Sequence, residues 1–115
     1  MNESPILGGV HRVDDIDTAD DLSKKHVPFI ATEREGDTVT ITAEVGHYLA
    51  HPNMSDHWID LIEIHANGAP IISYDFSAGV VAPKVIAVAK LDEGTKVTVF
   101  ERCNLHGYWA AETTV

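Results

Sequence analysis

The stretch Thr38–Val45, "TVTITAEV", decides the fold class, because its apolar and polar side chains alternate at every residue. The apolar residues that share one side are Val39, Ile41, Ala43 and Val45. Threonines and a glutamate occupy the other side. A period of two residues is typical of a β-strand with one buried and one solvated face. We therefore predict a half-buried strand here.

Further short strand-like segments lie on both sides of this stretch. "HWIDLIEIHA" and "APIISYDF" flank Asn67-Gly68, a dipeptide that tolerates positive φ and is typical of a two-residue hairpin turn. "KVIAVAKL", at 84–91, is apolar on both faces, which predicts a covered strand. The remaining strand-like segments are "HVPFIAT", "KVTVFER" and "GYWAAETTV". About seven short strands without a convincing amphipathic helix predict an all-β fold, an immunoglobulin-like antiparallel β-sandwich.

Length and composition limit the organisation and the partners. The 115 residues fit a single domain 1–115, with a loop-like N-terminal arm at 1–23 and the sandwich at 24–115. A net charge of −10 argues against nucleic acid and against an anionic membrane surface. No apolar run is long enough to span a membrane, and no secretory signal is visible. The single cysteine excludes an internal disulfide and agrees with a reducing compartment, so we expect a cytoplasmic protein.

The histidines and the cysteine are not scattered at random. We expect His26 at the start of the first strand, and the other members of the group in loops or at strand ends. The group consists of His26, His51, His57, Cys103 and His106. Imidazole suits zinc, copper, iron and nickel, and a thiolate adds a soft donor. Five protein ligands fit the closed tetrahedral site of structural zinc poorly, so the group indicates a metal site with one open position.

Three segments, "KKHVPFI", "HPNMSDHWIDLIEI" and "CNLHGYW", resemble the iron-binding segments of superoxide reductases of the one-iron neelaredoxin type, which are related to the desulfoferrodoxins. The resemblance extends from Lys24 to the C-terminus. It implies one iron per chain, with Cys103 as axial thiolate. The equatorial ligands that it implies are His26, His51, His57 and His106. The backbone N–H groups of Leu105 and His106 are expected to hydrogen-bond the sulfur.

The resemblance also implies an activity, which is reduction of superoxide to hydrogen peroxide by one electron, with no oxygen evolved. An external donor such as rubredoxin would return the electron. Lys25, which matches the lysine before the first histidine of the family, would act in catalysis by attracting the anion and ordering the water that delivers a proton. The family includes tetramers and dimers, so we expect a homotetramer or a homodimer.

One residue departs from the family pattern. Where many members carry a glutamate that closes the sixth iron position in the ferric state, this chain has Lys24. An ammonium group is not an anionic oxygen ligand. We therefore expect the sixth position in the ferric state to be open or filled by water or hydroxide.

Three other interpretations of the group remain. Cys103, His106 and two further histidines would suit a closed zinc site, and Cys103 with His106 would suit a nucleophile and its base. A binding module without metal would leave the placement of the five residues as coincidence. We expect the remaining histidines to be surface or packing residues; these are His11, His47 and His65. The carboxylates considered as partners of the ligand imidazoles are Glu44, Asp56 and Glu63.

Overall fold

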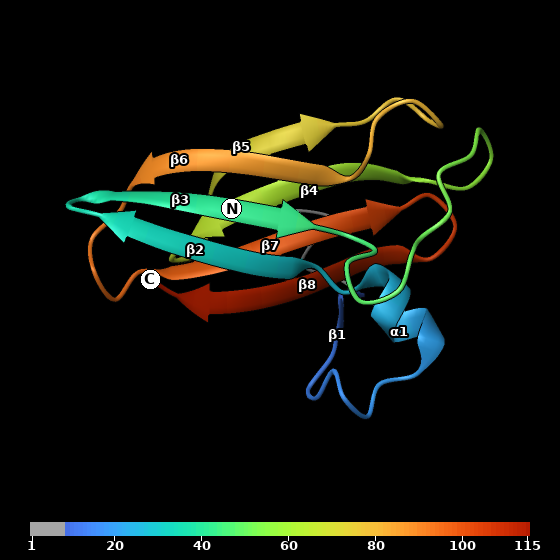
Figure 1. Cartoon of the computed structure of the whole chain (residues 1–115), viewed down its shortest axis with the longest axis horizontal. Coiled ribbons are helices and arrows are strands. Elements are labelled where there is room, and N and C mark those ends of the chain that lie inside the picture. The colour runs from blue at the N-terminus through green and yellow to red at the C-terminus, as the bar shows by residue number, and fades with distance from the viewer. Residues whose placement is uncertain (1–8) are drawn as a thin grey trace.

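The computed structural model describes residues 9–115, whose strands form two sheets packed face to face (Figure 1). The larger sheet has the strand order β1-β8-β7-β4-β5 and the smaller sheet has the order β2-β3-β6. The described elements are β1 (His11–Arg12), α1 (Asp21–His26), β2 (Phe29–Glu35), β3 (Thr38–Glu44), β4 (Ile59–Ala66), β5 (Ala69–Asp75), β6 (Lys84–Lys90), β7 (Lys96–Cys103) and β8 (Gly107–Thr114). All strand pairs are antiparallel except the short parallel pair β1–β8. The predicted immunoglobulin-like β-sandwich is confirmed.

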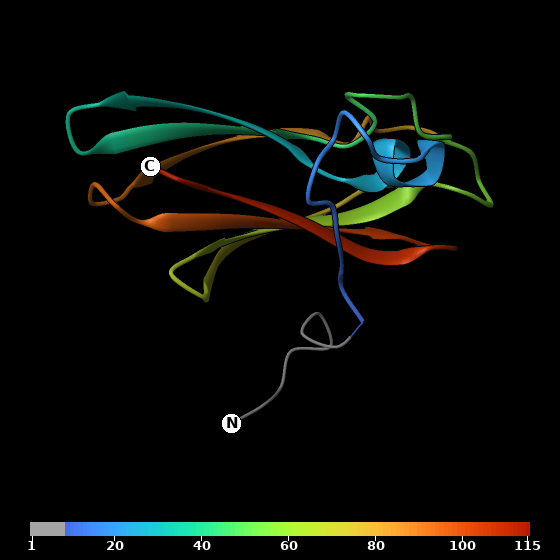
Figure 2. The same cartoon turned by 90° about the horizontal axis from the view of Figure 1, so that it is seen from below.

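The two sheets form separate layers in the view of Figure 2, and the buried apolar side chains of both form the core. The apolar side of β3 is fully buried, as its alternating sequence predicts. It packs against the inward side of the opposite sheet, where Ile62 and Ile64 of β4 meet Val97 and Val99 of β7. The predicted hairpin at Asn67-Gly68 joins β4 to β5, and both of its turn residues have positive φ, of 48° and 83°.

The N-terminal arm holds more regular structure than predicted. β1 pairs with β8, and the boundary predicted between residues 23 and 24 falls inside α1. The Asp20 side chain accepts a hydrogen bond of 2.8 Å from the backbone N–H of Ser23 and caps this helix. His26 therefore ends a helix, and the prediction that it starts a strand is wrong. Residues 1–8 of the predicted arm lie outside the described residues.

The prediction that β6 is covered on both faces is also wrong. Val85 and Ala87 face the core, whereas Ile86 and Val88 are 62% and 68% exposed. β6 is an edge strand of the three-stranded sheet, and in the described part of the chain no further layer packs on its outer face. None of the helices between residues 9 and 115 has the length and apolarity needed to cross a membrane.

Candidate metal centre

The longer connections of the fold gather at one end of the sandwich, together with α1 (Figure 1). His26 is the last residue of α1, and Cys103 is the last residue of β7. His51 and His57 lie in the connection between β3 and β4, and His106 lies in the turn between β7 and β8. The fold thus brings all five predicted site residues to the same end.

The four imidazole rings form a closed ring of neighbours. Going round it, the centroid distances are 4.7 Å from His26 to His51, 4.8 Å to His57, 5.4 Å to His106 and 5.0 Å back to His26. The Cys103 Sγ lies 3.4 Å from Nε2 of His51. One donor atom from each of His26, His51, His57 and Cys103 lies within 4.8 Å of the others, so a single ion can contact all of them.

The proton positions on two imidazoles are set by backbone carbonyls. Nδ1 of His26 lies 2.6 Å from the Leu22 carbonyl, and Nδ1 of His51 lies 2.6 Å from the Pro52 carbonyl. A carbonyl only accepts, so each Nδ1 carries the proton and each Nε2 carries a lone pair. These two Nε2 atoms face each other at 3.2 Å. Two lone pairs at this distance repel, and a cation that both can bind relieves the repulsion.

A third imidazole gives independent support for a cation. Nε2 of His57 is buried, and no hydrogen-bond partner for it exists among the described residues. An unpartnered buried nitrogen costs free energy unless it is bound by something else. The residues present therefore fit a metal ion with imidazole and thiolate ligands.

Burial favours the neutral form of the His26 and His51 imidazoles, which is the form that binds a metal. It lowers the pKa of His26, and it lowers the pKa of His51 to about 4, with further lowering from the neighbouring imidazoles. Burial also raises the pKa of the Cys103 thiol, whereas backbone hydrogen bonds from Leu105 and His106 lower it. A metal cation at the sulfur would hold the thiolate form.

Comparison with known proteins agrees with this geometry. A family model described as desulfoferrodoxin matches residues 18–112. The chain belongs to the desulfoferrodoxin family. A superoxide reductase of Pyrococcus horikoshii is 34% identical over 106 residues, covering 84% of this chain and 92% of the relative. A desulfoferrodoxin of Nitratidesulfovibrio vulgaris is 40% identical over 96 residues, covering 83% of this chain and 68% of the relative. The solved structure of a superoxide reductase from Nanoarchaeum equitans has a TM-score of 0.74 at 32% identity, covering 80% of this chain and 94% of that one.

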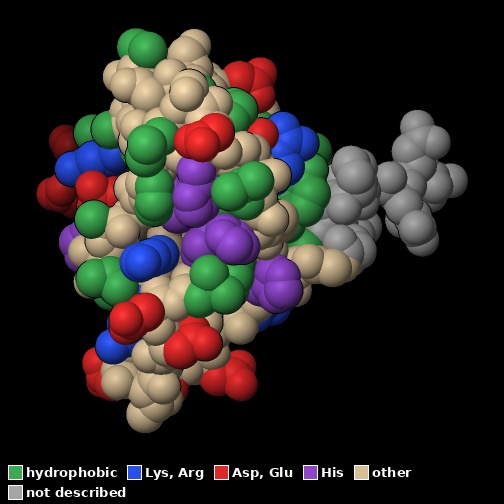
Figure 3. Space-filling view, turned by 90° about the vertical axis from the view of Figure 1, so that its right-hand side faces the viewer, with side chains coloured by type: hydrophobic (Ala, Val, Ile, Leu, Met, Phe, Trp, Pro, Cys, Tyr) green, Lys and Arg blue, Asp and Glu red, His purple; other side chains and the backbone are tan. Residues whose placement is uncertain are grey.

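Two lysines precede His26 on α1. Lys24 and Lys25 are both half-buried, and no carboxylate lies within 4.0 Å of either ammonium among residues 9–115. Lys24 lines a shallow hollow of about 300 Å³ together with Ile16, Asp17 and Tyr48. In the space-filling view of this end, histidines reach the surface with a cationic side chain beside them (Figure 3).

Aromatic and amide side chains hold the surrounding loops. The Trp109 ring stacks on His26 at 5.1 Å, and the Trp58 indole N–H donates to the Phe76 carbonyl at 3.0 Å. Asn104 accepts from the Trp58 backbone N–H at 2.9 Å and donates to the Asp56 carbonyl at 2.9 Å. The turn that follows Cys103 is thereby fixed to the loop that carries His57.

The carboxylates considered as partners of the ligand imidazoles are not their partners. Glu44 contacts His47 at 2.8 Å, and Glu63 contacts His65 at 2.6 Å. His47 stacks on Phe29 at 3.7 Å and His65 is buried, which confirms packing roles outside the cluster. The partners of the His26 and His51 imidazoles are the Leu22 and Pro52 carbonyls. A predicted helix over 21–26 would have indicated the Leu22 carbonyl, because residue i−4 lies next to residue i in a helix.

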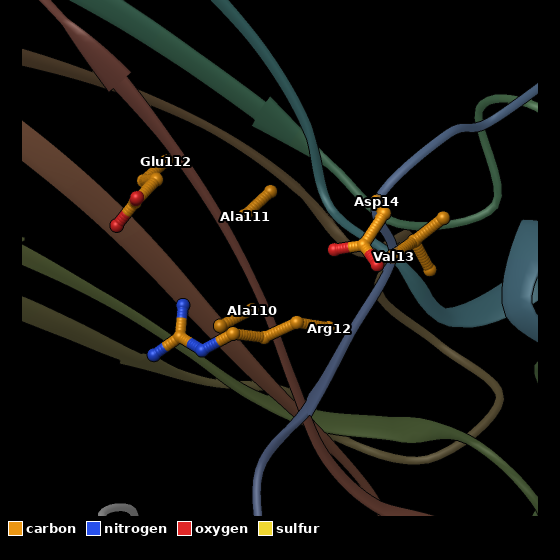
Figure 4. A pocket seen from close by; sticks show the side chains of 6 residues that line it. All are labelled: Arg12, Val13, Asp14, Ala110, Ala111 and Glu112. Atoms are coloured by element: carbon orange, nitrogen blue, oxygen red, sulfur yellow. The ribbon is translucent and has the colours of Figure 1, made fainter.

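A second hollow, of about 240 Å³, lies beside β1 and β8 (Figure 4). Its walls are formed by Arg12, Val13, Asp14, Ala110, Ala111 and Glu112. It contains no imidazole or thiol, and it is separate from the metal centre.

Proposed function

We propose that this chain is a superoxide reductase that holds one iron ion through four imidazoles and one thiolate. The proposed ligands are His26, His51, His57, His106 and Cys103. The closed ring of four imidazoles with the sulfur beside it carries the proposal. Relatives named superoxide reductase share this family, which supports the same activity here.

The number and type of donors favour iron over zinc. Structural zinc sites are closed with four ligands. Donor atoms of His26, His51, His57 and Cys103 lie within 4.8 Å of one another, and the His106 ring, 5.0 Å from that of His26, would add a fifth. A mixture of imidazole and thiolate suits a redox-active transition metal. Four imidazoles and one sulfur would leave room for a small anion at a bound ion, and Lys24 offers no anionic oxygen to fill that position.

Bound iron supplies the one-electron chemistry by cycling between the ferrous and ferric states. The Cys103 thiolate donates electron density, and the N–H groups of Leu105 and His106 stabilise its charge. The Lys25 ammonium, next to His26, attracts superoxide toward a chain whose net charge is −10. It also orders the water that delivers a proton. The superoxide anion gains one electron and two protons and leaves as hydrogen peroxide, with no oxygen evolved.

The test combines metal analysis, a visible spectrum and superoxide kinetics on the purified protein. We expect one iron per chain and a sulfur-to-iron charge-transfer band that disappears on reduction. Cys103→Ser should abolish this band. Ferrous protein should be oxidised by a pulse of superoxide without release of oxygen. Bound zinc, or oxygen release at half the superoxide consumed, would contradict the proposal.

The cellular setting follows from the same chemistry. We place the protein in the cytoplasm, where a single thiol stays reduced, and we propose rubredoxin as the electron donor. We propose that the whole chain acts as one domain and assembles as a homotetramer or a homodimer. Light scattering distinguishes these two assemblies from a monomer.

A further inference from the structure

Exposed apolar side chains gather on one side of the metal centre. Val80, Leu105 and Met54 are 79%, 61% and 59% exposed, and Val81 is also exposed. They come from three different connections, which are 45–58, 76–83 and 104–106. Figure 3 shows hydrophobic side chains next to the histidines on this end of the molecule. We call the four side chains the apolar rim.

Hydrogen bonds join the three connections into one surface. The Asn53 side chain donates to the Val81 carbonyl at 3.2 Å and accepts from the Gly79 N–H at 2.9 Å. The Asn104 side chain donates to the Asp56 carbonyl at 2.9 Å. Amide side chains therefore hold the apolar rim in place, so that little order has to be gained on binding.

Charged side chains are nearly absent from this surface. Across 51–58, 77–83 and 104–106, Asp56 is the only Asp, Glu, Lys or Arg. The whole chain has 26 such residues, from 18 acidic and 8 basic ones. Depletion of charge with exposed apolar side chains marks the core of a protein–protein interface. The apolar rim is thus an uncharged surface on a strongly acidic protein.

The apolar rim and the lysines lie at different corners of the imidazole ring. Met54 is joined to His57 by two backbone hydrogen bonds, of 2.9 and 3.2 Å. His57 neighbours His51 and His106 in the ring, and His26, which follows Lys25 on α1, occupies the corner opposite. An occupant of the apolar rim therefore leaves the approach past Lys25 free.

Leu105 connects the apolar rim to the sulfur. Its side chain belongs to the rim, and its backbone N–H bonds the Cys103 thiol. A protein docked on Leu105 is therefore separated from the sulfur by a single short turn. Electron transfer between proteins needs such proximity and a small, transient contact.

We propose that the apolar rim is the docking surface for a small one-electron carrier protein whose own metal centre reaches the surface through uncharged apolar side chains. The inference rests on the proposed function, since a reductase that oxidises its iron needs an electron returned. In each encounter, one electron leaves the reduced metal of the carrier and reduces the ferric iron of this protein. No bond forms or breaks, and no proton moves.

The test uses reduced rubredoxin as the carrier and the iron-loaded ferric protein in stopped flow. Met54→Ser and Val80→Ser should each lower the second-order rate constant of ferric reduction by roughly fivefold or more. Reduction by ascorbate, which needs no docking, should not change. Val88→Ser is the matched control, because Val88 is an equally exposed apolar side chain on β6, outside the rim. Raising the ionic strength should not slow rubredoxin, since the contact is uncharged.

Several outcomes would overturn the inference. They are unchanged rates in the Met54 and Val80 variants, an equal loss in the Val88 variant, an equal loss with ascorbate, and a wild-type protein that rubredoxin does not reduce. Oxidation of ferrous protein by a superoxide pulse is measured separately and tests the proposed function alone. If the wild-type protein failed the superoxide assay while the rim variants still slowed reduction by rubredoxin, the docking surface would stand and the proposed function would not.

Discussion

The two ends of the sandwich differ in the length of their connections and in the site residues that those connections contribute. At the end away from the metal centre, short turns such as Gly36-Asp37 and Asn67-Gly68 join neighbouring strands and contribute no site residue. At the other end, the connection 45–58 supplies two imidazoles, and 104–106 supplies a third. Strand pairing alone determines the conformation of the short turns, whereas contacts between loops determine the conformation of the connections at the metal end.

Two glycines with the same backbone angle show this difference most directly. Gly46, at the metal end, has φ +85°, and Gly94, at the opposite end, has φ +86°. A Cβ on Gly46 would lie 2.9 Å from the backbone nitrogen of His51, while a Cβ on Gly94 would have no heavy atom within 4 Å. The metal-end glycine therefore serves close packing against the ligand loop as well as the turn.

The largest effect is expected from removing one imidazole of the ring. His57→Ala deletes a donor whose Nε2 has no other partner among the described residues, so iron affinity should fall by at least about 100-fold. His65→Ala is the control, because the buried His65 pairs with Glu63 and packs on Phe100 at 4.6 Å, outside the ring. It should retain iron and lose roughly 1–3 kcal/mol of unfolding free energy. Iron titration and thermal unfolding measure both, and loss of iron from the His65 variant would refute the ligand assignment.

The glycine pair provides the next test. Gly46→Ala combines backbone strain with a clash at His51, so it should weaken iron binding roughly tenfold as the loop shifts. Gly94→Ala meets the strain alone and should cost about 1–2 kcal/mol of stability with iron affinity unchanged. Iron competition with a chelator and denaturant unfolding separate the two effects. Equal iron affinity in both variants would show that the turn at Gly46 does not position His51.

A smaller effect is expected where the core meets the metal end. Glu101, two residues before Cys103, is fully buried, and neither of its carboxylate oxygens has a hydrogen-bond partner in the described part of the chain. Burial, with repulsion from Asp60, raises its pKa well above the usual range. Glu101→Leu should therefore stabilise the metal-free protein by about 1–3 kcal/mol in denaturant unfolding.

The exposed Glu33→Leu on β2 is the control for this change, and its effect should stay within about 0.5 kcal/mol. A destabilised Glu101 variant would show that the carboxylate supports the core. A gain in stability would indicate that this carboxylate is kept at a cost to the fold beside the metal centre.

The sequence predicted the parts of the fold that depend on local pattern. The alternation in β3 and the turn at Asn67-Gly68 both depend on neighbouring residues only, and both predictions are confirmed. The proposed ligands were selected by spacing and residue type. The structure places donor atoms of His26, His51, His57 and Cys103 within 4.8 Å of one another, with the His106 ring 5.0 Å from that of His26. The exposed side of β6 was missed because exposure at an edge strand depends on the order of strands in the sheet.

The helix was missed because α1 has only six residues, too few to show a helical period. Its capping residue was visible in the sequence, since Asp20 precedes an acidic first turn and a basic last turn. Without the helix, the bond from His26 to the Leu22 carbonyl had no basis in the sequence. The carboxylates were considered instead, because carbonyl partners depend on the backbone path.

The smallest effect is expected from the Asp20 cap, which stabilises the helix that ends at His26. Asp20→Ala removes the bond to the Ser23 N–H and should lower the melting temperature by about 2–4 °C, whereas Asp20→Asn keeps an acceptor and should lower it less. The cap also lowers the pKa of Asp20 from its ordinary value of 3.8. The contribution of the carboxylate charge is therefore present above this value and is lost as the pH falls below it. In acid the melting temperature of the wild type should fall toward that of Asp20→Asn, whose neutral acceptor does not titrate. A wild-type advantage over Asp20→Asn that persists there would show that the carboxylate charge plays no part in holding α1.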